Sequence, residues 1–174
     1  MTSSQVTEGT AMLRAFGTSP ADVRSRLERE LDAFEVAVTR AGGRWNDALP
    51  NRTWTAAQEA EHVILVNEST ARIVALLNSD KTLRPVPAVP GEMVEGRRQA
   101  PAAVQPGPGQ AWDELEGRHA ASRAALLGQV ERATDDPERR FFHVFLGDLT
   151  ALDWLRMAAY HVRHHRRQVE AASA

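Results

Sequence analysis

Three histidines have the residue type and spacing most suited to chemistry in this sequence. His161 and His165 are four residues apart near the C-terminus, and His62 lies much earlier in the chain. On an α-helix, two residues at i and i+4 project from one face, one turn apart. An imidazole from a neighbouring helix would complete a three-nitrogen site for a divalent metal ion. Such a site leaves coordination positions open, as catalytic zinc sites do.

Helical projection at about 100° per residue indicates which histidines face the interior. His62 falls within an apolar stripe, and His165 falls within the apolar arc of the last predicted helix. His161 lies at the edge of that arc, whereas His164 projects further toward the polar side. The pattern therefore favours the pair His161 and His165 over the pair His161 and His164.

The elements that must position these side chains are predicted to be helices. Apolar residues recur with a helical period in four segments, about 20–41, 55–78, 109–133 and 150–171. Ser19 and Pro20 supply an N-cap and a proline at the first helical position, and Thr55 with Gln58 matches a capping box. Thr150 is a similar cap for the last helix. No strand-like alternation stands out, so the predicted fold class is all-α, a four-helix bundle.

The segment between the second and third predicted helices is rich in proline. Six of the nine prolines fall between Pro85 and Pro108, which excludes a tight turn, although Met93 to Gln99 could form a short helix. About 30 residues suffice to run the length of a bundle and join two parallel helices. We therefore expect a long crossover here; the alternatives are a mobile linker or a lid over one end of the bundle.

Other polar residues of the predicted helices have simpler interpretations. Arg156 falls on the polar arc of the last helix, which we expect to face solvent. His119 points inward from the third helix, and with Ser122 and Ser69 it suggests a polar pocket inside the bundle. His143 lies in an aromatic stretch and is interpreted as a core or loop residue.

Composition restricts the functional classes. The chain has 174 residues, 43% of them hydrophobic and 25% charged, and a net charge of −2, so we expect neither nucleic acid nor a membrane surface as a partner. It contains no cysteine, which excludes disulfides, thiolate ligands and a cysteine nucleophile. No apolar run approaches the roughly 18 residues of a membrane span, and the N-terminus lacks signal-peptide features. We expect a cytoplasmic protein with a tail or short extra helix over 1–18 and one bundle domain over 19–171.

Two stretches resemble the DinB/YfiT-like superfamily of small four-helix metalloproteins. The first runs from Leu49 through Trp54 to His62, and is similar to the proline and tryptophan before helix two and the first metal histidine of that family. The second begins at Leu146 and ends with the His161-x-x-x-His165 pair and a glutamine three residues later. The likeness spans about residues 19–171.

This resemblance implies more than the residue pattern alone. It implies that His62, His161 and His165 are the metal ligands, that the bundle has up-down-down-up topology, and that the protein is a homodimer. The usual metal of the family is zinc, sometimes nickel. Characterised members include transferases that depend on a low-molecular-weight thiol, and the founding member was named for induction by DNA damage.

Two hypotheses from different classes follow. The first is a divalent-metal-dependent enzyme with a small-molecule substrate. It would be a hydrolase if the metal lowers the pKa of bound water to about 7, or a transferase if the metal binds a small thiol. Its general base would be His119, Glu59 or His164. The second is a non-catalytic stress-response bundle that acts as a binding or dimeric scaffold protein, with the histidines in a hydrogen-bonded network or a structural metal site.

Overall fold

The computed structural model describes residues 11–49 and 53–172. Residues 1–10 of the predicted tail and Pro50 of the first family motif lie outside the described residues. The elements in chain order are η1 (Arg14–Phe16), α2 (Pro20–Ala41), η2 (Gly42–Arg44), α3 (Ala56–Leu77), β1 (Met93–Val94), β2 (Arg97–Arg98), η3 (Ala102–Val104), α4 (Trp112–Val130), β3 (Phe141–His143), β4 (Gly147–Leu149) and α5 (Ala151–Ala172), where η marks a 3₁₀ turn.

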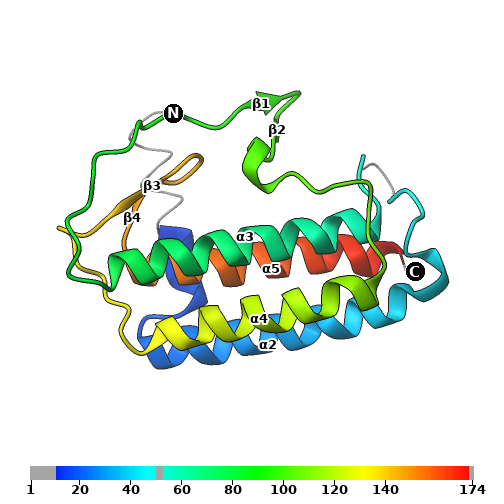
Figure 1. The fold of residues 1–174 in the computed structure, drawn as a ribbon, viewed down its shortest axis with the longest axis horizontal. Coiled ribbons are helices and arrows are strands. Elements are labelled where there is room, and N and C mark those ends of the chain that lie inside the picture. Colours follow the sequence, from blue (N-terminus) through cyan, green and yellow to red (C-terminus); the bar gives the residue numbers. More distant parts are fainter. Residues whose placement is uncertain (1–10, 50–52, 173–174) are drawn as a thin grey trace.

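Four long helices form a bundle, which confirms the predicted fold class. Figure 1 shows α3 and α4 running in one direction and α2 and α5 in the other, with the connection between α3 and α4 returning along the outside of the bundle. α5 packs between α2 and α3, and α4 packs mainly against α3 and also against α2. α5 therefore faces α3 along its length, which brings the predicted metal histidines onto adjacent helices.

The predicted helix starts are confirmed at Ser19 and Thr55. The Ser19 hydroxyl accepts the backbone N–H of Asp22 at 3.2 Å, and the Asp22 carboxylate accepts the backbone N–H of Ser19 at 3.0 Å. Thr55 and Gln58 make the same reciprocal pair, at 3.3 and 3.1 Å. Because these caps satisfy backbone donors that the first turn leaves free, they define the residue at which each helix begins.

The third helix is shorter than predicted, and the proline-rich segment forms a hairpin and the 3₁₀ turn η3 but no α-helix. α4 begins at Trp112 rather than near 109 because Gly109 has a φ of 98°, outside the helical region. The suggested short helix over Met93–Gln99 is wrong, because β1 and β2 pair there as an antiparallel hairpin. Glu95 and Gly96 at its turn have φ of 50° and 76°, the two positive values that a type I′ turn requires.

A second short hairpin, β3–β4, precedes α5 and was not predicted. Phe141 pairs with Leu149 and His143 with Gly147. Gly91 of the crossover packs on this hairpin and donates its N–H to the Val144 carbonyl at 2.9 Å. A Cβ at Gly91 would lie only 2.3 Å from the ring of Phe145, so a side chain at this position would require that ring to move.

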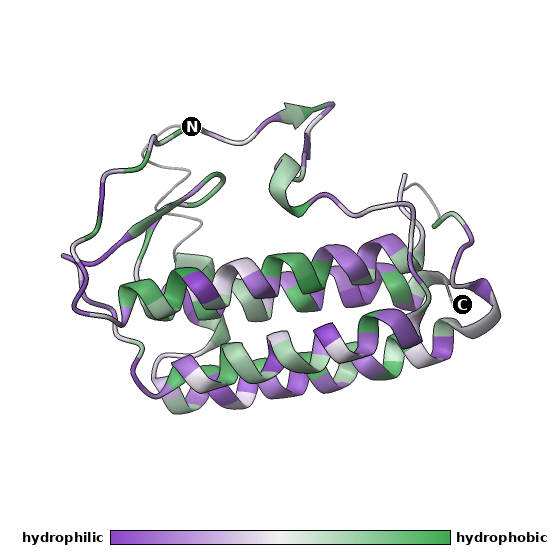
Figure 2. Cartoon of the chain, in the orientation of Figure 1, coloured by the Kyte–Doolittle hydropathy of each residue, from purple (hydrophilic) through white to green (hydrophobic). Residues whose placement is uncertain are grey.

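The hydrophobic core runs the length of the bundle. Its fully buried members include Leu31 of α2, Val63 of α3, Leu126 of α4 and Leu155 of α5. Figure 2 shows hydrophobic and hydrophilic residues interspersed along all four helices. This amphipathic periodicity is the pattern that predicted the helices. Within the described residues, none of the helices has the length and apolarity to cross a membrane.

Arg156 contradicts the expectation that its arc of the last helix faces solvent, because it is fully buried. Its guanidinium donates to both carboxylate oxygens of Asp135, at 2.7 and 3.1 Å, and to Asp153 at 2.7 Å. It also donates to the carbonyl of Gly17 at 2.8 Å. Asp135 and Gly17 lie in segments outside α5 and place hydrogen-bond acceptors against this arc. Arg156, which is polar by helical projection, therefore forms internal ion pairs.

Candidate metal centre

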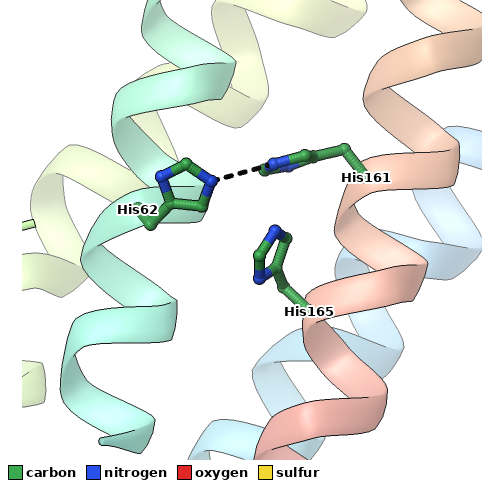
Figure 3. A group of neighbouring side chains, drawn as sticks. All are labelled: His62, His161 and His165. Carbon is green, nitrogen blue, oxygen red and sulfur yellow. Dashed lines mark hydrogen bonds between the residues drawn. The ribbon is translucent and has the colours of Figure 1, made fainter. Parts of the chain in front are cut away.

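The structure brings the three predicted histidines together in the interior of the bundle. His62 comes from α3, and His161 and His165 project one turn apart from the facing side of α5. Each offers one ring nitrogen, and these three atoms all lie within 4.8 Å of one another. Figure 3 shows the three rings meeting in the space between the two helices. His62 and His165 are buried, with 5% and 6% of their surfaces exposed, whereas His161 is partly exposed.

Hydrogen bonds on the outer side of two rings determine which nitrogen points inward. The Nδ1 atom of His62 lies 2.6 Å from the carbonyl oxygen of Val104, and the Nδ1 atom of His165 contacts the carboxylate of Glu59. A carbonyl oxygen can only accept, so Nδ1 of His62 carries a proton and Nε2 remains for a ligand. The same assignment for His165 leaves its Nε2 directed toward the other two rings.

Two of these nitrogens have the spacing that a tetrahedral metal ion needs, whereas the separations of up to 4.8 Å within the group would have to shorten for one ion to bind all three. The Nε2 atoms of His62 and His161 are 3.1 Å apart. Metal–nitrogen bonds of about 2.0–2.1 Å in a tetrahedral site place two ligand nitrogens about 3.3 Å apart. Two ring nitrogens this close need a proton or a metal ion between them, because their lone pairs would otherwise face each other.

The electrostatic surroundings keep His161 in the form that a metal ion needs. Burial, followed by the neighbouring imidazoles of His165 and His62, holds the pKa of His161 well below its usual value of 6.5. The ring is therefore neutral at neutral pH and retains a lone pair. Its Nδ1 atom is enclosed and has no hydrogen-bond partner among the described residues.

An aromatic wall closes one side of the centre. The ring of Trp54, just before α3, lies 4.8 Å from the ring of His62 and 6.5 Å from that of His165, measured between centroids. Trp54 is itself half-buried. Its indole therefore borders both imidazoles.

His119 lies apart from this group, so the inferred polar pocket around it is not part of the centre. His119 of α4 contacts the Glu35 carboxylate of α2 at 3.1 Å, and burial lowers the pKa of His119. Ser122 donates to the carbonyl of His119 within the same helix, at 2.9 Å. His164 is exposed, and its ring lies 6.4 Å from that of Tyr160 and 5.0 Å from that of His165. The position of His119 does not support it as a general base at the three-histidine group, whereas His164 borders the group from its exposed side.

Two residues of the centre were not identified from sequence in the roles that they have. Glu59 was a candidate general base, but it is fully buried and contacts His165. It precedes His62 by three residues, so helical spacing alone could have placed it on the same side of α3. Val104 lies in the crossover, and no sequence pattern indicated that its carbonyl would reach His62.

Comparisons with known proteins agree with this fold. A sequence model described as the DinB superfamily matches residues 23–169, a range that includes all three histidines. Among solved structures, the chain is similar to "TT2238, a four-helix bundle protein", at 29% sequence identity and a TM-score of 0.61. That match covers 86% of this chain and 96% of the other. No curated protein matches the chain. Because the family match extends over most of the sequence, this chain belongs to the DinB superfamily.

Proposed function

We propose that this protein is a metal-dependent enzyme whose divalent cation is held by Nε2 of His62, His161 and His165. The observation that carries the proposal is that three imidazole nitrogens lie within 4.8 Å of one another. Contacts at Nδ1 turn the Nε2 atoms of His62 and His165 inward. Hydrogen bonding of a ligand's second ring nitrogen is typical of histidine metal sites. Three protein ligands leave room for a small molecule, as in catalytic rather than structural zinc sites.

The chemistry that such an ion supplies is Lewis-acid activation of water or of a thiol, which corresponds to a hydrolase or a small-thiol-dependent transferase. The chain contributes no cysteine of its own, so any thiol at the centre belongs to a small molecule. The role of the chain is to hold three imidazoles in place, with Trp54 and the Val104 carbonyl of the crossover beside them. Zinc and nickel both accept imidazole ligands, and we propose one of them as the resident ion.

Metal analysis of protein purified without a histidine tag tests the proposal. We expect about one equivalent of zinc or nickel per chain. His161→Ala or His165→Ala should lower the metal affinity at least about 100-fold, because losing a ligand costs more than losing a group that hydrogen-bonds to a ligand, which typically costs about 10- to 100-fold. His164→Ala is the matched control on the same helix, and its affinity should stay within about twofold of wild type since the ring lies outside the group. Circular dichroism of each variant checks that the bundle is intact.

The opposite outcome is equally specific. If the wild-type chain binds Zn²⁺ and Ni²⁺ no more tightly than a variant with all three histidines replaced by alanine, there is no metal centre at this position. A second measurement tests the transferase class. If this class is right, adding a low-molecular-weight thiol to the Co²⁺-loaded protein will produce a sulfur-to-cobalt charge-transfer absorption, and the absence of that band would exclude it.

A further inference from the structure

The two inward-turned histidines have different partners behind them. His62 is supported by a neutral backbone carbonyl, that of Val104, whereas His165 is supported by the carboxylate of Glu59. Glu59 lies one turn before His62 on α3, so the helix that supplies one proposed ligand also supplies the contact that holds a ligand of α5. Glu59 is fully buried in this position.

We infer that Glu59 is the positioning residue of the centre, acting on the bound cation through His165. Its carboxylate accepts the Nδ1–H of His165, which fixes the ring in the tautomer that presents Nε2 and sets the orientation of the ring plane. It also places a negative charge behind the ligand, which makes the imidazole a stronger donor. This inference rests on the proposed function, because the ligand that Glu59 orients is one of the three proposed there.

The alternatives for a buried glutamate are weaker on this geometry. Nδ1 and Nε2 lie on opposite sides of the imidazole ring, so Glu59 is behind His165 relative to the ion. A general base must come within hydrogen-bond reach of the proton that it removes, and a group behind a ligand does not. Burying a carboxylate is costly unless a positive partner compensates for it. A divalent cation held by His165 supplies such a partner through the ring.

The first part of the test needs no metal. Long-range ¹H–¹⁵N correlation spectra of the metal-free protein, labelled at histidine nitrogens, distinguish the Nδ1–H tautomer from the Nε2–H tautomer. In the wild type we expect His165 as the Nδ1–H form. Glu59→Leu should abolish that preference, whereas Glu59→Gln should retain it, because the amide oxygen can still accept. Glu68→Gln is the matched control on α3, since Glu68 pairs with Arg118 at 3.0 Å.

The second part measures the effect on the ion. Glu59→Gln is nearly isosteric and removes only the charge, so we expect its affinity for Co²⁺ to fall about 10- to 100-fold. Its Co²⁺ absorption spectrum should change as well, because the ligand field of His165 weakens. A purely structural role would leave that spectrum unchanged. Glu68→Gln should bind Co²⁺ with wild-type affinity and spectrum.

The outcomes distinguish this inference from the proposal on which it rests. If the wild type binds Co²⁺ but Glu59→Gln has the same affinity and spectrum, Glu59 does not position the ligand, and the metal centre stands. If His165 is found as the Nε2–H tautomer in the wild type, the inference is also overturned. If the wild type binds no Co²⁺, the proposed function fails and the inference fails with it.

Discussion

Replacing Arg156 by methionine would remove a buried charge and keep most of the aliphatic volume of the side chain. The guanidinium makes hydrogen bonds of 2.7 and 3.1 Å to Asp135, 2.7 Å to Asp153 and 2.8 Å to the Gly17 carbonyl. Burial alone would raise the pKa of Asp135, but hydrogen bonds from Arg156 and Thr150 outweigh it and hold that pKa below its usual value. The variant leaves both aspartates without this cation.

The size of the loss follows from burial. Breaking a buried pair by removing one partner costs about 3–5 kcal/mol. The Asp135 side chain is 30% exposed and can regain some hydration, whereas that of Asp153 is only 13% exposed. We therefore expect the free energy of unfolding of Arg156→Met to fall by about 3 kcal/mol, at the low end of that range. For a chain of this size, that corresponds to a decrease in Tm of about 6–12 °C.

Urea denaturation followed by far-UV circular dichroism measures this change. Arg167→Met, an exposed arginine on the same helix, should change the free energy of unfolding by less than about 0.5 kcal/mol. In a double-mutant cycle, Arg156→Met and Asp135→Asn should show a coupling of about 1–3 kcal/mol. If Arg156→Met costs less than about 1 kcal/mol, no more than a typical substitution, the guanidinium is not the internal ion pair described above.

Three further predictions concern acid, the crossover and the metal. Burial, followed by the charge of Arg98, lowers the pKa of His143 to about 4. The unfolded chain, with a histidine pKa of about 6.5, binds more protons between these values, so stability falls as the pH falls through that window, by about 2 kcal/mol at about pH 5. Urea titrations near neutral pH and near pH 5 should show that His143→Gln loses less of its free energy of unfolding between these pH values than the wild type does. The Glu61 carboxylate accepts the Gly107 N–H at 3.0 Å. Glu61→Ala should therefore speed amide hydrogen exchange at Gly107 about 10- to 100-fold and leave exchange in α5 unchanged. Hydrogen-exchange mass spectrometry measures both. Zinc at about 100 times its Kd should raise the free energy of unfolding of the wild type by about 2.7 kcal/mol. Calorimetry should show a higher Tm with zinc and its reversal by a chelator. An unchanged Tm would contradict this prediction.

Local sequence was sufficient to predict the helices and which side of each helix faces the interior. Ser19 and Thr55 cap helices where expected because a capping residue and the donor that it satisfies are within three residues of each other. The inward direction of His62 and His165 was predictable for the same reason, since helical periodicity relates each residue to its near neighbours. The proline-rich crossover was also recognisable from composition, although its internal hairpin was not.

What surrounds each predicted face depended on segments distant in the sequence. Arg156 lies on a polar arc by projection, yet Asp135 and Gly17 enclose it. The Val104 carbonyl reaches His62 across 42 residues, and Glu59 reaches His165 across 106. Periodicity within one helix determines the direction of a side chain but carries no information about what another segment places opposite it. The three histidines could therefore be selected from sequence, whereas the groups that orient them were decided by the packing of α3, α5 and the crossover.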